Sequence, residues 1–286
     1  MLVRLLSALV AAPIVLGMVL WPGGDAPFRG WPLALLVLLL TVGAMWELYH
    51  GCRQAGLLPR EGVGYAAALL FLLAATPLLR GAADVTLQFG LTLLLTGSLA
   101  WEALRRDRAP LKALPATWFG AFYIGWLFPY LLRLRLLPLT PLTGLPDWMA
   151  AMGEGAWLLL WVLVTTSSTD TGAYLVGKRW GRHKLAPEVS PGKTWEGAVG
   201  GFIASVLVAW GLGALLGLPT AFALAGGALT GVVSQLGDLS KSAIKREIGV
   251  KDFGTLMPGH GGILDRFDSL LFAAPAIYWL TQLWQR

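Results

Sequence analysis

The stretch at residues 155–176, GAWLLLWVLVTTSSTDTGAYLV, begins with apolar residues and continues with seven consecutive hydroxyl or carboxyl side chains at 165–171. A helix of about 20 mostly apolar residues is long enough to cross the hydrocarbon core of a bilayer. A carboxylate at such depth, here Asp170, costs about 2.5–3.5 kcal/mol and is a functional candidate for that reason. The alternative is a run at the membrane edge that only caps a helix. This segment predicts a transmembrane helix with a polar site attached to it.

Composition extends the prediction to the whole chain. Hydrophobic residues make up 56% of the 286 residues and charged residues 13%, and the mean hydropathy is +0.65. A soluble protein has about 25% charged residues, and half of that cannot cover a water-soluble fold. These numbers also exclude disorder, and a single cysteine, Cys52, excludes a disulfide scaffold or a cysteine-built zinc site. The predicted fold is an all-α, polytopic helical bundle in the membrane.

Nine apolar runs approach the length of a membrane span, and their continuous Leu/Ala-rich sequence argues against a β-barrel. The first run could pass for a signal sequence, but no convincing small-residue cleavage site follows it, so we expect a retained span. Leu218-Pro219 breaks the seventh run from the eighth. The predicted spans are 5–21, 31–50, 63–79, 85–101, 115–137, 155–176, 197–217, 219–237 and 268–284.

Lys and Arg residues are distributed unevenly between the two sides of this bundle. With nine spans, 17 of the 22 fall on the side of the N-terminus and of the loops near 51–62, 102–114, 177–196 and 238–267. The positive-inside rule then predicts an integral protein of the cytoplasmic (plasma) membrane, with the N-terminus and these loops in the cytoplasm. The net charge of +6 describes this face, which suits anionic lipid headgroups, so we expect no nucleic-acid partner.

Charged residues also concentrate along the chain, since residues 178–196 and 238–268 hold 17 of the 38 charges in 50 positions. We therefore expect residues 1–150 to form an N-terminal transmembrane frame of about five spans. Residues 151–286 are expected to form a catalytic transmembrane region that carries the last two cytoplasmic loops. No convincing internal repeat is present, which counts weakly against a secondary transporter.

Residues 177–197, GKRWGRHKLAPEVSPGKTWEG, contain enough Gly and Pro to predict a loop. Ser190, Lys193 and Thr194 place hydroxyls and an ammonium beside backbone N–H groups at the start of a helix, which suits phosphate oxygens. The G-x-x-x-x-G-K-[ST] spacing of a Walker A loop is missing. A turn with topology-setting cations is the alternative interpretation.

Residues 237–268, GDLSKSAIKREIGVKDFGTLMPGHGGILDRFD, alternate aspartates with Lys and Arg. Asp238 ends the predicted eighth span, while Asp265 and Asp268 begin the ninth, so an antiparallel pair of helices would bring these ends together. Carboxylates at one surface repel each other unless a divalent cation lies among them, and Mg²⁺ takes one or two carboxylates plus substrate phosphates. The pattern predicts a magnesium-dependent phosphate site, with a solvated loop held by salt bridges as the alternative.

In this segment the chain closely resembles the phosphatidate cytidylyltransferases (CDP-diacylglycerol synthases). Their pattern reads roughly S-x-[apolar]-K-R, four residues, K-D, then P-x-H-G-G-[apolar]-x-D-R-[apolar]-D. TDTGAY and SPGKTWEG also look like that family, so the resemblance covers about 165–268. Family members often carry an acidic residue just before the motif serine, where this chain has Lys241. The matching positions are Ser242, Lys245, Arg246, Lys251, Asp252, Pro258, His260, Gly261, Gly262, Asp265, Arg266 and Asp268.

The resemblance implies transfer of the cytidylyl group from CTP to phosphatidic acid, giving CDP-diacylglycerol and pyrophosphate. It implies Mg²⁺ as cofactor and leaves open a monovalent cation beside it. Because the attacking phosphate is already anionic, no serine or cysteine nucleophile is required, and catalysis consists of bringing two polyanions together. The expected partners are CTP, phosphatidic acid and the lipid bilayer. The family also implies a homodimer, which no GxxxG stripe establishes.

The resemblance further implies that Asp238 and Asp265 hold the metal with Asp268 and Asp170 in support, and that the basic residues clamp phosphates. His260 would contact phosphate or orient a carboxylate. The expected catalytic residues are Asp238, Asp265, Lys245, Arg246, Lys251, Asp252, His260 and Arg266; the expected substrate-binding residues are Asp170, Ser190, Lys193, Thr194, Ser242, Gly261 and Gly262; and the expected metal ligands are Asp238, Asp265 and Asp268.

Two other functions compete with this reading. A transporter with an intramembrane polar path would also carry polar residues in its spans, but it predicts them in several spans at mid-membrane. Here they gather at one face and in loops, which favours an enzyme. A CTP-dependent polyprenol kinase is closer in chemistry and is not excluded by residues alone.

Overall fold

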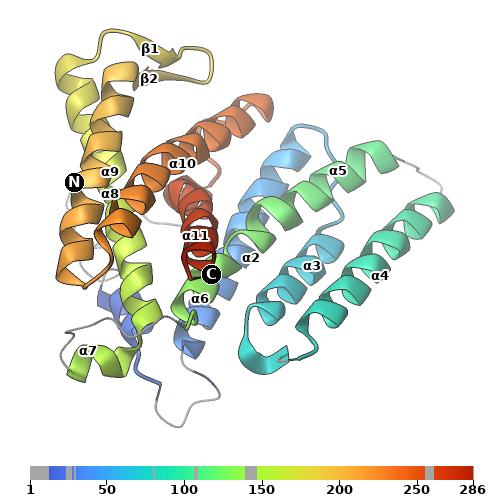
Figure 1. The fold of residues 1–286 in the computed structure, drawn as a ribbon. Coiled ribbons are helices and arrows are strands. Elements are labelled where there is room, and N and C mark those ends of the chain that lie inside the picture. The colour runs from blue at the N-terminus through green and yellow to red at the C-terminus, as the bar shows by residue number, and fades with distance from the viewer. Residues whose placement is uncertain are drawn as a thin grey trace. The chain divides into compact units, whose positions relative to one another are not determined.

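A computed structural model describes residues 13–23, 28, 30–79, 81–105, 109–138, 147–254 and 261–285. This part of the chain is mainly helical and includes one two-stranded hairpin (Figure 1). It divides into two compact units, each assembled from several segments. The first unit comprises Met1–Val15, Trp31–Arg133 and Ile248–Arg266, and the second comprises Leu16–Gly30, Leu134–Glu247 and Phe267–Arg286.

The first unit is a group of apolar helices. Its elements are α2 (Trp31–Gln54), α3 (Glu61–Ala74), η1 (Pro77–Leu79), α4 (Ala83–Leu104), α5 (Pro110–Gly120), the π-helical turn η2 (Ala121–Trp126) and most of α6 (Pro129–Arg135).

Tyr49 on α2 organises the core of this unit. Its side chain is buried and its hydroxyl donates a hydrogen bond to the Thr117 carbonyl on α5 at 2.7 Å. The ring lies against Gly64 on α3 and Gly120 on α5, where a Cβ would overlap it. A second cluster forms around Phe71, which packs with Trp126 and leucines of α4. Glycine at two facing positions thus lets one aromatic side chain join three helices.

The second unit contains the hairpin and the longest helices. Residues 13–20 are helical as well. The other elements are α7 (Asp147–Met152), α8 (Glu154–Trp180), β1 (Lys184–Ala186), β2 (Ser190–Thr194), α9 (Trp195–Leu215), α10 (Thr220–Glu247) and α11 (Leu264–Trp284), of which the residues from Phe267 onward belong here.

Small residues on one face of α9 bring α8 and α10 close to it. The buried residues recur at every fourth position and are Gly197, Gly201, Ser205, Ala209 and Gly213. At Gly201 a Cβ would lie 2.7 Å from the Thr169 carbonyl oxygen of α8, and the Ser205 hydroxyl donates to the Gly227 carbonyl of α10 at 2.7 Å. Small residues of this kind let helix backbones approach in membranes. The three helices therefore pack against one another, with the hairpin connecting α8 to α9 (Figure 1).

Gly197 and Gly201 have GxxxG spacing. In the structure both glycines lie on the face of α9 that packs against α8 of the same chain. The predicted homodimer accordingly gains no support from this stripe and stays a prediction.

The helices agree with the predicted apolar runs in position. Among the described residues, four helices are long and apolar enough to cross a membrane: Trp31–Gln54, Ala83–Leu104, Trp195–Leu215 and Thr220–Glu247. The break at Leu218-Pro219 is confirmed, because α9 ends at Leu215 and α10 begins at Thr220. The run 115–137 is divided between α5, η2 and α6. The predicted number of nine spans stays a prediction.

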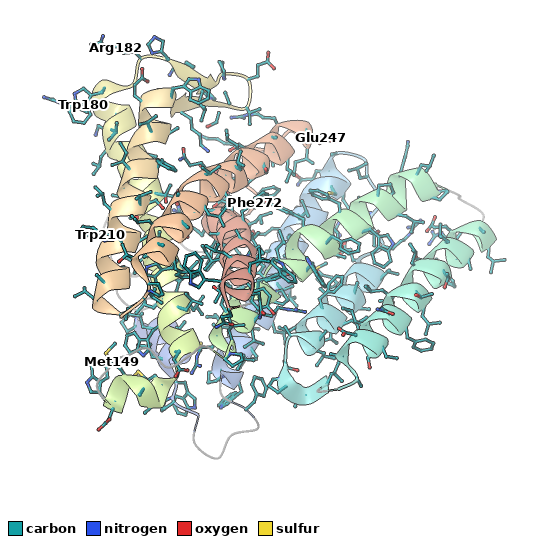
Figure 2. The ribbon with its side chains drawn as sticks, viewed as in Figure 1. Met149, Trp180, Arg182, Trp210, Glu247 and Phe272 are labelled. Atoms are coloured by element: carbon teal, nitrogen blue, oxygen red, sulfur yellow. The ribbon has the colours of Figure 1, made fainter. Side chains whose placement is uncertain are left out.

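The predicted loops 177–196 and 238–267 are longer than the connections between helices in the structure. Helix α8 continues to Trp180, α10 continues to Glu247 and α11 begins at Leu264. Charge ends the apolar run but not the helix, because 238–247 contains neither Gly nor Pro. Figure 2 shows Trp180 and Arg182 where α8 meets the hairpin and Trp210 farther along α9.

Gly201→Ala should destabilise the second unit, since its methyl group would lie 2.7 Å from the Thr169 carbonyl oxygen of α8. Overpacking of this kind costs about 1–3 kcal/mol. A lower apparent unfolding temperature in detergent is the expected result. Gly211→Ala is the matched control, because a Cβ at Gly211 on the same helix meets nothing within 4 Å. Equal unfolding temperatures for the two variants would contradict this packing.

Candidate functional site

A cavity of about 490 Å³ lies in the second unit between α8, the hairpin, α9 and α10. Asp170 of α8 and Asp238 of α10 line it, and the hairpin contributes Ser190, Lys193 and Thr194. Pockets for small molecules have volumes of roughly 300–1,000 Å³. The structure thus brings together five predicted site residues from three separate segments of the sequence.

The hairpin replaces the predicted loop at 184–194. Strand β1 pairs antiparallel with β2, with Lys184 opposite Thr194 and Ala186 opposite Ser190. The Lys184 ammonium donates to the Pro191 carbonyl at 2.7 Å, which ties the two strands together. The Gly and Pro content correctly predicted that the chain reverses direction here. It did not predict the pairing of the two strands that flank the turn.

Two side chains fix the junction between the hairpin and α9. The Thr194 hydroxyl accepts a hydrogen bond from the Gly197 N–H at 3.1 Å and so caps the helix. The Glu196 carboxylate accepts backbone N–H groups of Arg182 at 3.0 Å and His183 at 3.2 Å. Lys193, which lies just before this junction, is thereby held at the cavity wall.

Asp238 lies between two ammonium groups. Its Oδ2 is 2.9 Å from Lys193 Nζ, and its Oδ1 is 3.0 Å from Lys241 Nζ. Lys241 also pairs with Asp268, whose Oδ2 is 2.5 Å away. Lys241 and Asp268 are only 8% and 5% exposed, so this pair is held in a poorly solvated place. The basic residue noted before the motif serine is therefore the central cation of an Asp–Lys–Asp group.

Close approach of α10 and α11 places Asp268 in this group. A Cβ at Gly237 would lie 2.6 Å from the Asp268 carbonyl oxygen, so only glycine fits where the helices cross. The next residue, Ser269, places its hydroxyl 3.4 Å from Asp170 Oδ1 on α8. Three helices thus contribute one carboxylate each to the same part of the unit.

Magnesium fits this site in its donor chemistry. Asp170 and Asp238 both line the cavity, and Mg²⁺ takes one or two carboxylates together with substrate phosphates. Within the described residues no group of three or more His, Cys, Asp or Glu could hold a metal by itself. Asp265 belongs to the first unit, where its Oδ2 accepts the Phe253 N–H at 3.0 Å. The metal roles of Asp238, Asp265 and Asp268 stay predictions.

The remaining predicted residues are spread over both units. The Ser242 hydroxyl donates to the Asp238 carbonyl at 2.8 Å, and Arg246 Nε donates to the Val189 carbonyl at 3.3 Å, which links α10 to the hairpin. Lys245 lies on the last turn of α10. Lys251, Asp252, Gly261, Gly262 and Arg266 belong to the first unit, and Pro258 and His260 lie outside the described residues.

The sequence analysis did not predict several polar residues that line the cavity or are buried in the first unit. Gln235 lines the cavity from α10, and its amide donates to the Ala198 carbonyl at 3.1 Å. Lys178 and Tyr174 line it from the end of α8. Glu47, in the first unit, is a fully buried carboxylate. The signal for Gln235 and Glu47 was available, because each is a polar residue inside a predicted span, as Asp170 is.

The cavity combines hydroxyls, ammonium groups and carboxylates beside the start of an apolar helix. Such a set of groups binds phosphates, with or without a divalent cation. Fold and site together define a helical membrane protein with a cavity whose polar groups suit phosphate.

Comparison with known proteins identifies the family. The profile of the cytidylyltransferase family matches residues 2–284, so the chain belongs to this family.

The chain is similar to two proteins named phosphatidate cytidylyltransferase and to one that is uncharacterized. The phosphatidate cytidylyltransferase of Synechocystis sp. is 33% identical over 308 aligned residues, which cover 98% of this chain and 96% of that protein. The phosphatidate cytidylyltransferase of Bacillus subtilis is 43% identical over 166 residues, 57% of this chain and 56% of that protein. The uncharacterized Escherichia coli protein YnbB is 44% identical over 166 residues, which cover 56% of this chain and 52% of that protein. The chain spans little more than half the length of the last two.

Lys241→Met should destabilise the protein strongly, because it leaves the buried Asp268 carboxylate without its cation. Breaking a buried ion pair costs about 3–5 kcal/mol. Lys241→Met combined with Asp268→Asn should recover part of this loss, which apparent unfolding temperatures in detergent would reveal. Lys112→Met removes an exposed ammonium from α5 and is the matched control. If Lys241→Met unfolds at the wild-type temperature, the Asp–Lys–Asp group is not a structural unit.

Proposed function

We propose that the chain transfers the cytidylyl group of CTP to phosphatidic acid and releases pyrophosphate, so that it synthesises CDP-diacylglycerol for phospholipid biosynthesis. The observation that carries this proposal is the cavity lined by Asp170, Lys193 and Asp238 in a chain of the cytidylyltransferase family. Relatives named phosphatidate cytidylyltransferase support the choice of substrates.

The reaction needs charge compensation more than a nucleophile. An anionic phosphate oxygen of phosphatidic acid attacks the α-phosphorus of CTP, and the bond from that phosphorus to the bridging oxygen of the β-phosphate breaks. The electron pair leaves with pyrophosphate, and no proton has to be removed. Lys193 and Lys178 at the cavity wall would neutralise phosphate charge, and the Thr194 hydroxyl would help to orient the nucleotide.

Magnesium is the cofactor we propose for this site. When bound, Mg²⁺ supplies neutralisation of charge on the α-phosphate and on the departing pyrophosphate. Asp170 and Asp238 are the cavity residues that would hold it, with Asp265 as the further ligand predicted from the sequence. A monovalent cation beside it remains a prediction.

A lipid substrate suits the surroundings of the cavity. The same parts of α8 and α9 also line an apolar groove of about 660 Å³, whose walls include Val176, Trp195 and Val199. A charged cavity and an apolar groove on two shared helices match an amphiphile with an anionic head. We propose a cytoplasmic membrane location with the N-terminus and the site on the cytoplasmic side, in line with the distribution of Lys and Arg.

Position-specific labelling of CTP separates this function from its rivals. Purified protein with phosphatidic acid should move label from the α-phosphate of CTP into lipid, while label at the γ-phosphate is released as pyrophosphate. Label from the γ-phosphate in a polyprenol would indicate a CTP-dependent kinase. Uptake of a solute by vesicles with no labelled lipid would indicate a transporter. Either of these last two results would replace the proposed function.

Asp265→Asn should abolish transfer while the protein stays folded in the membrane, because the change removes one charge at nearly constant size. Loss of labelled lipid with an unchanged gel-filtration profile is the expected result. Arg29→Ala serves as the control and should retain activity. The predicted spans place Arg29 on the membrane face opposite to the basic loops. Full activity in Asp265→Asn would remove this residue from the site.

Removal of divalent cations should stop the reaction reversibly. Treatment with a chelator is expected to abolish incorporation of label into lipid, and added Mg²⁺ should restore it, because two polyanions must meet at the site. Titration of Mg²⁺ against the initial rate provides the measurement. Undiminished transfer in excess chelator would contradict a magnesium cofactor.

A further inference from the structure

Glu47 is a fully buried carboxylate in α2, a helix long and apolar enough to cross a membrane. An ionisable side chain in such a helix is costly and marks a functional site by default. The motif that carries the resemblance to cytidylyltransferases lies far from it in the sequence, and residues 1–150 were expected to act only as a frame. The contacts of this carboxylate in the first unit suggest a further role for α2.

Both oxygens of Glu47 bind the start of α11. Oε1 accepts the Ile263 N–H at 2.9 Å and Oε2 accepts the Leu264 N–H at 3.1 Å, across 216 and 217 residues of sequence. The first N–H groups of a helix have no partner within the helix. A carboxylate is favoured there because the helix dipole makes this end positive. Glu47 therefore caps α11 from another helix.

Two glycines make room for this carboxylate. A Cβ at Gly262 would lie 2.6 Å from Glu47 Oε2, and a Cβ at Gly254 would lie 2.7 Å from Glu47 Oε1. Gly261, with φ of +85°, occupies backbone space that favours glycine. The glycines of the motif thus have a partner within the protein, and the chain on both sides of residues 255–260 converges on Glu47.

Asp265 and Arg266 follow directly after the two N–H groups that Glu47 holds. The Asp265 carboxylate accepts the Phe253 N–H at 3.0 Å, so it is tied to the residue beside Gly254. Glu47, Gly254, Gly262 and Asp265 therefore form one connected arrangement within the first unit. A shift at Glu47 would change the direction in which the side chains of the first turn of α11 leave the helix.

We propose that Glu47 is a positioning residue for the transferase reaction, which holds the Gly-Gly turn and the first turn of α11 so that Asp265 and Arg266 point correctly. This inference rests on the proposed function. It assigns to α2 the task of ordering the first turn of α11 within the first unit, through backbone hydrogen bonds and without contact with substrate.

The main test compares Glu47→Gln with wild type in two independent measurements. Glutamine keeps the size but presents an amide NH₂ group to one of the backbone N–H donors. Misplacement of reacting groups by about 1 Å costs on the order of 100-fold in rate, so kcat per folded molecule should fall by that order while the KM for CTP changes little. Hydrogen–deuterium exchange at Ile263 and Leu264 should speed up about tenfold, in keeping with the loss of a charged hydrogen bond.

Glu102→Gln is the matched control. Glu102 is 1% exposed, lies in the apolar helix α4 and pairs with Arg60, the N-cap residue of α3. This variant should lower the apparent unfolding temperature but leave kcat per folded molecule and exchange at 263 and 264 unchanged. A loss of kcat equal to that of Glu47→Gln would mean that Glu47 acts only through general stability, and the proposal would fall.

A second pair of variants tests the geometry directly. Gly262→Ala alone should lower kcat, because its methyl group overlaps the Glu47 carboxylate. Combined with Glu47→Asp, which withdraws the carboxylate by one methylene, its effect should be smaller than the product of the two single effects. Fully multiplicative effects would show that the two side chains do not meet and would overturn the proposal.

Failure of the two proposals can be told apart. If the wild type transfers no label to lipid, the proposed function fails, and the exchange measurement still decides whether Glu47 holds the start of α11. If the wild type is active and Glu47→Gln has the same kcat, only the role of Glu47 is refuted.

Discussion

A carboxylate inside an apolar helix has to find its partner within the protein, because the hydrocarbon core of a membrane offers no water to solvate it. Glu47 accepts two backbone N–H groups at the start of α11, Glu102 pairs with Arg60, and Asp268 pairs with Lys241. Each match joins segments far apart in sequence. Contact between apolar surfaces does not favour one pair of segments over another, since lipid tails cover an apolar surface as well as another helix does. The buried carboxylates therefore determine which segments meet.

Small residues decide how closely those segments approach. The stripe on α9 that includes Gly201 and Ser205 lets α8 and α10 pack against it, and Gly237 lets α10 cross α11. Without the close crossing at Gly237, Asp268 could not reach the ammonium of Lys241 on the neighbouring turn of α10. Close packing in the apolar part of the second unit thus sets the positions of the charged groups at its polar end.

Hydropathy and motif spacing predict much of this molecule. The apolar runs locate the helices, the break at Leu218-Pro219 is correct, and Asp170, Lys193 and Asp238 line one cavity. Hydropathy could not predict that α10 continues through its charged residues to Glu247, because helix formation does not require apolar residues. The strand pairing of Ser190 and Ala186 depends on a partner that periodicity does not reveal. Charge density along the chain does not reveal Glu47, because it is a single charge in the apolar run 31–50.

Lys241 sets the charge of the group that it forms with Asp238 and Asp268. Its ammonium lies between Asp238 and Asp268, so the three side chains together carry one negative charge, whereas an acidic residue at this place would bring the total to three. An ammonium neutralises carboxylates but offers no coordination positions to phosphate oxygens, which a divalent cation does. Asp268 is only 5% exposed in its pair with Lys241, whereas the side chain of Asp238 is 32% exposed beside Lys193. A single lysine thus joins a buried aspartate to one that lines the cavity.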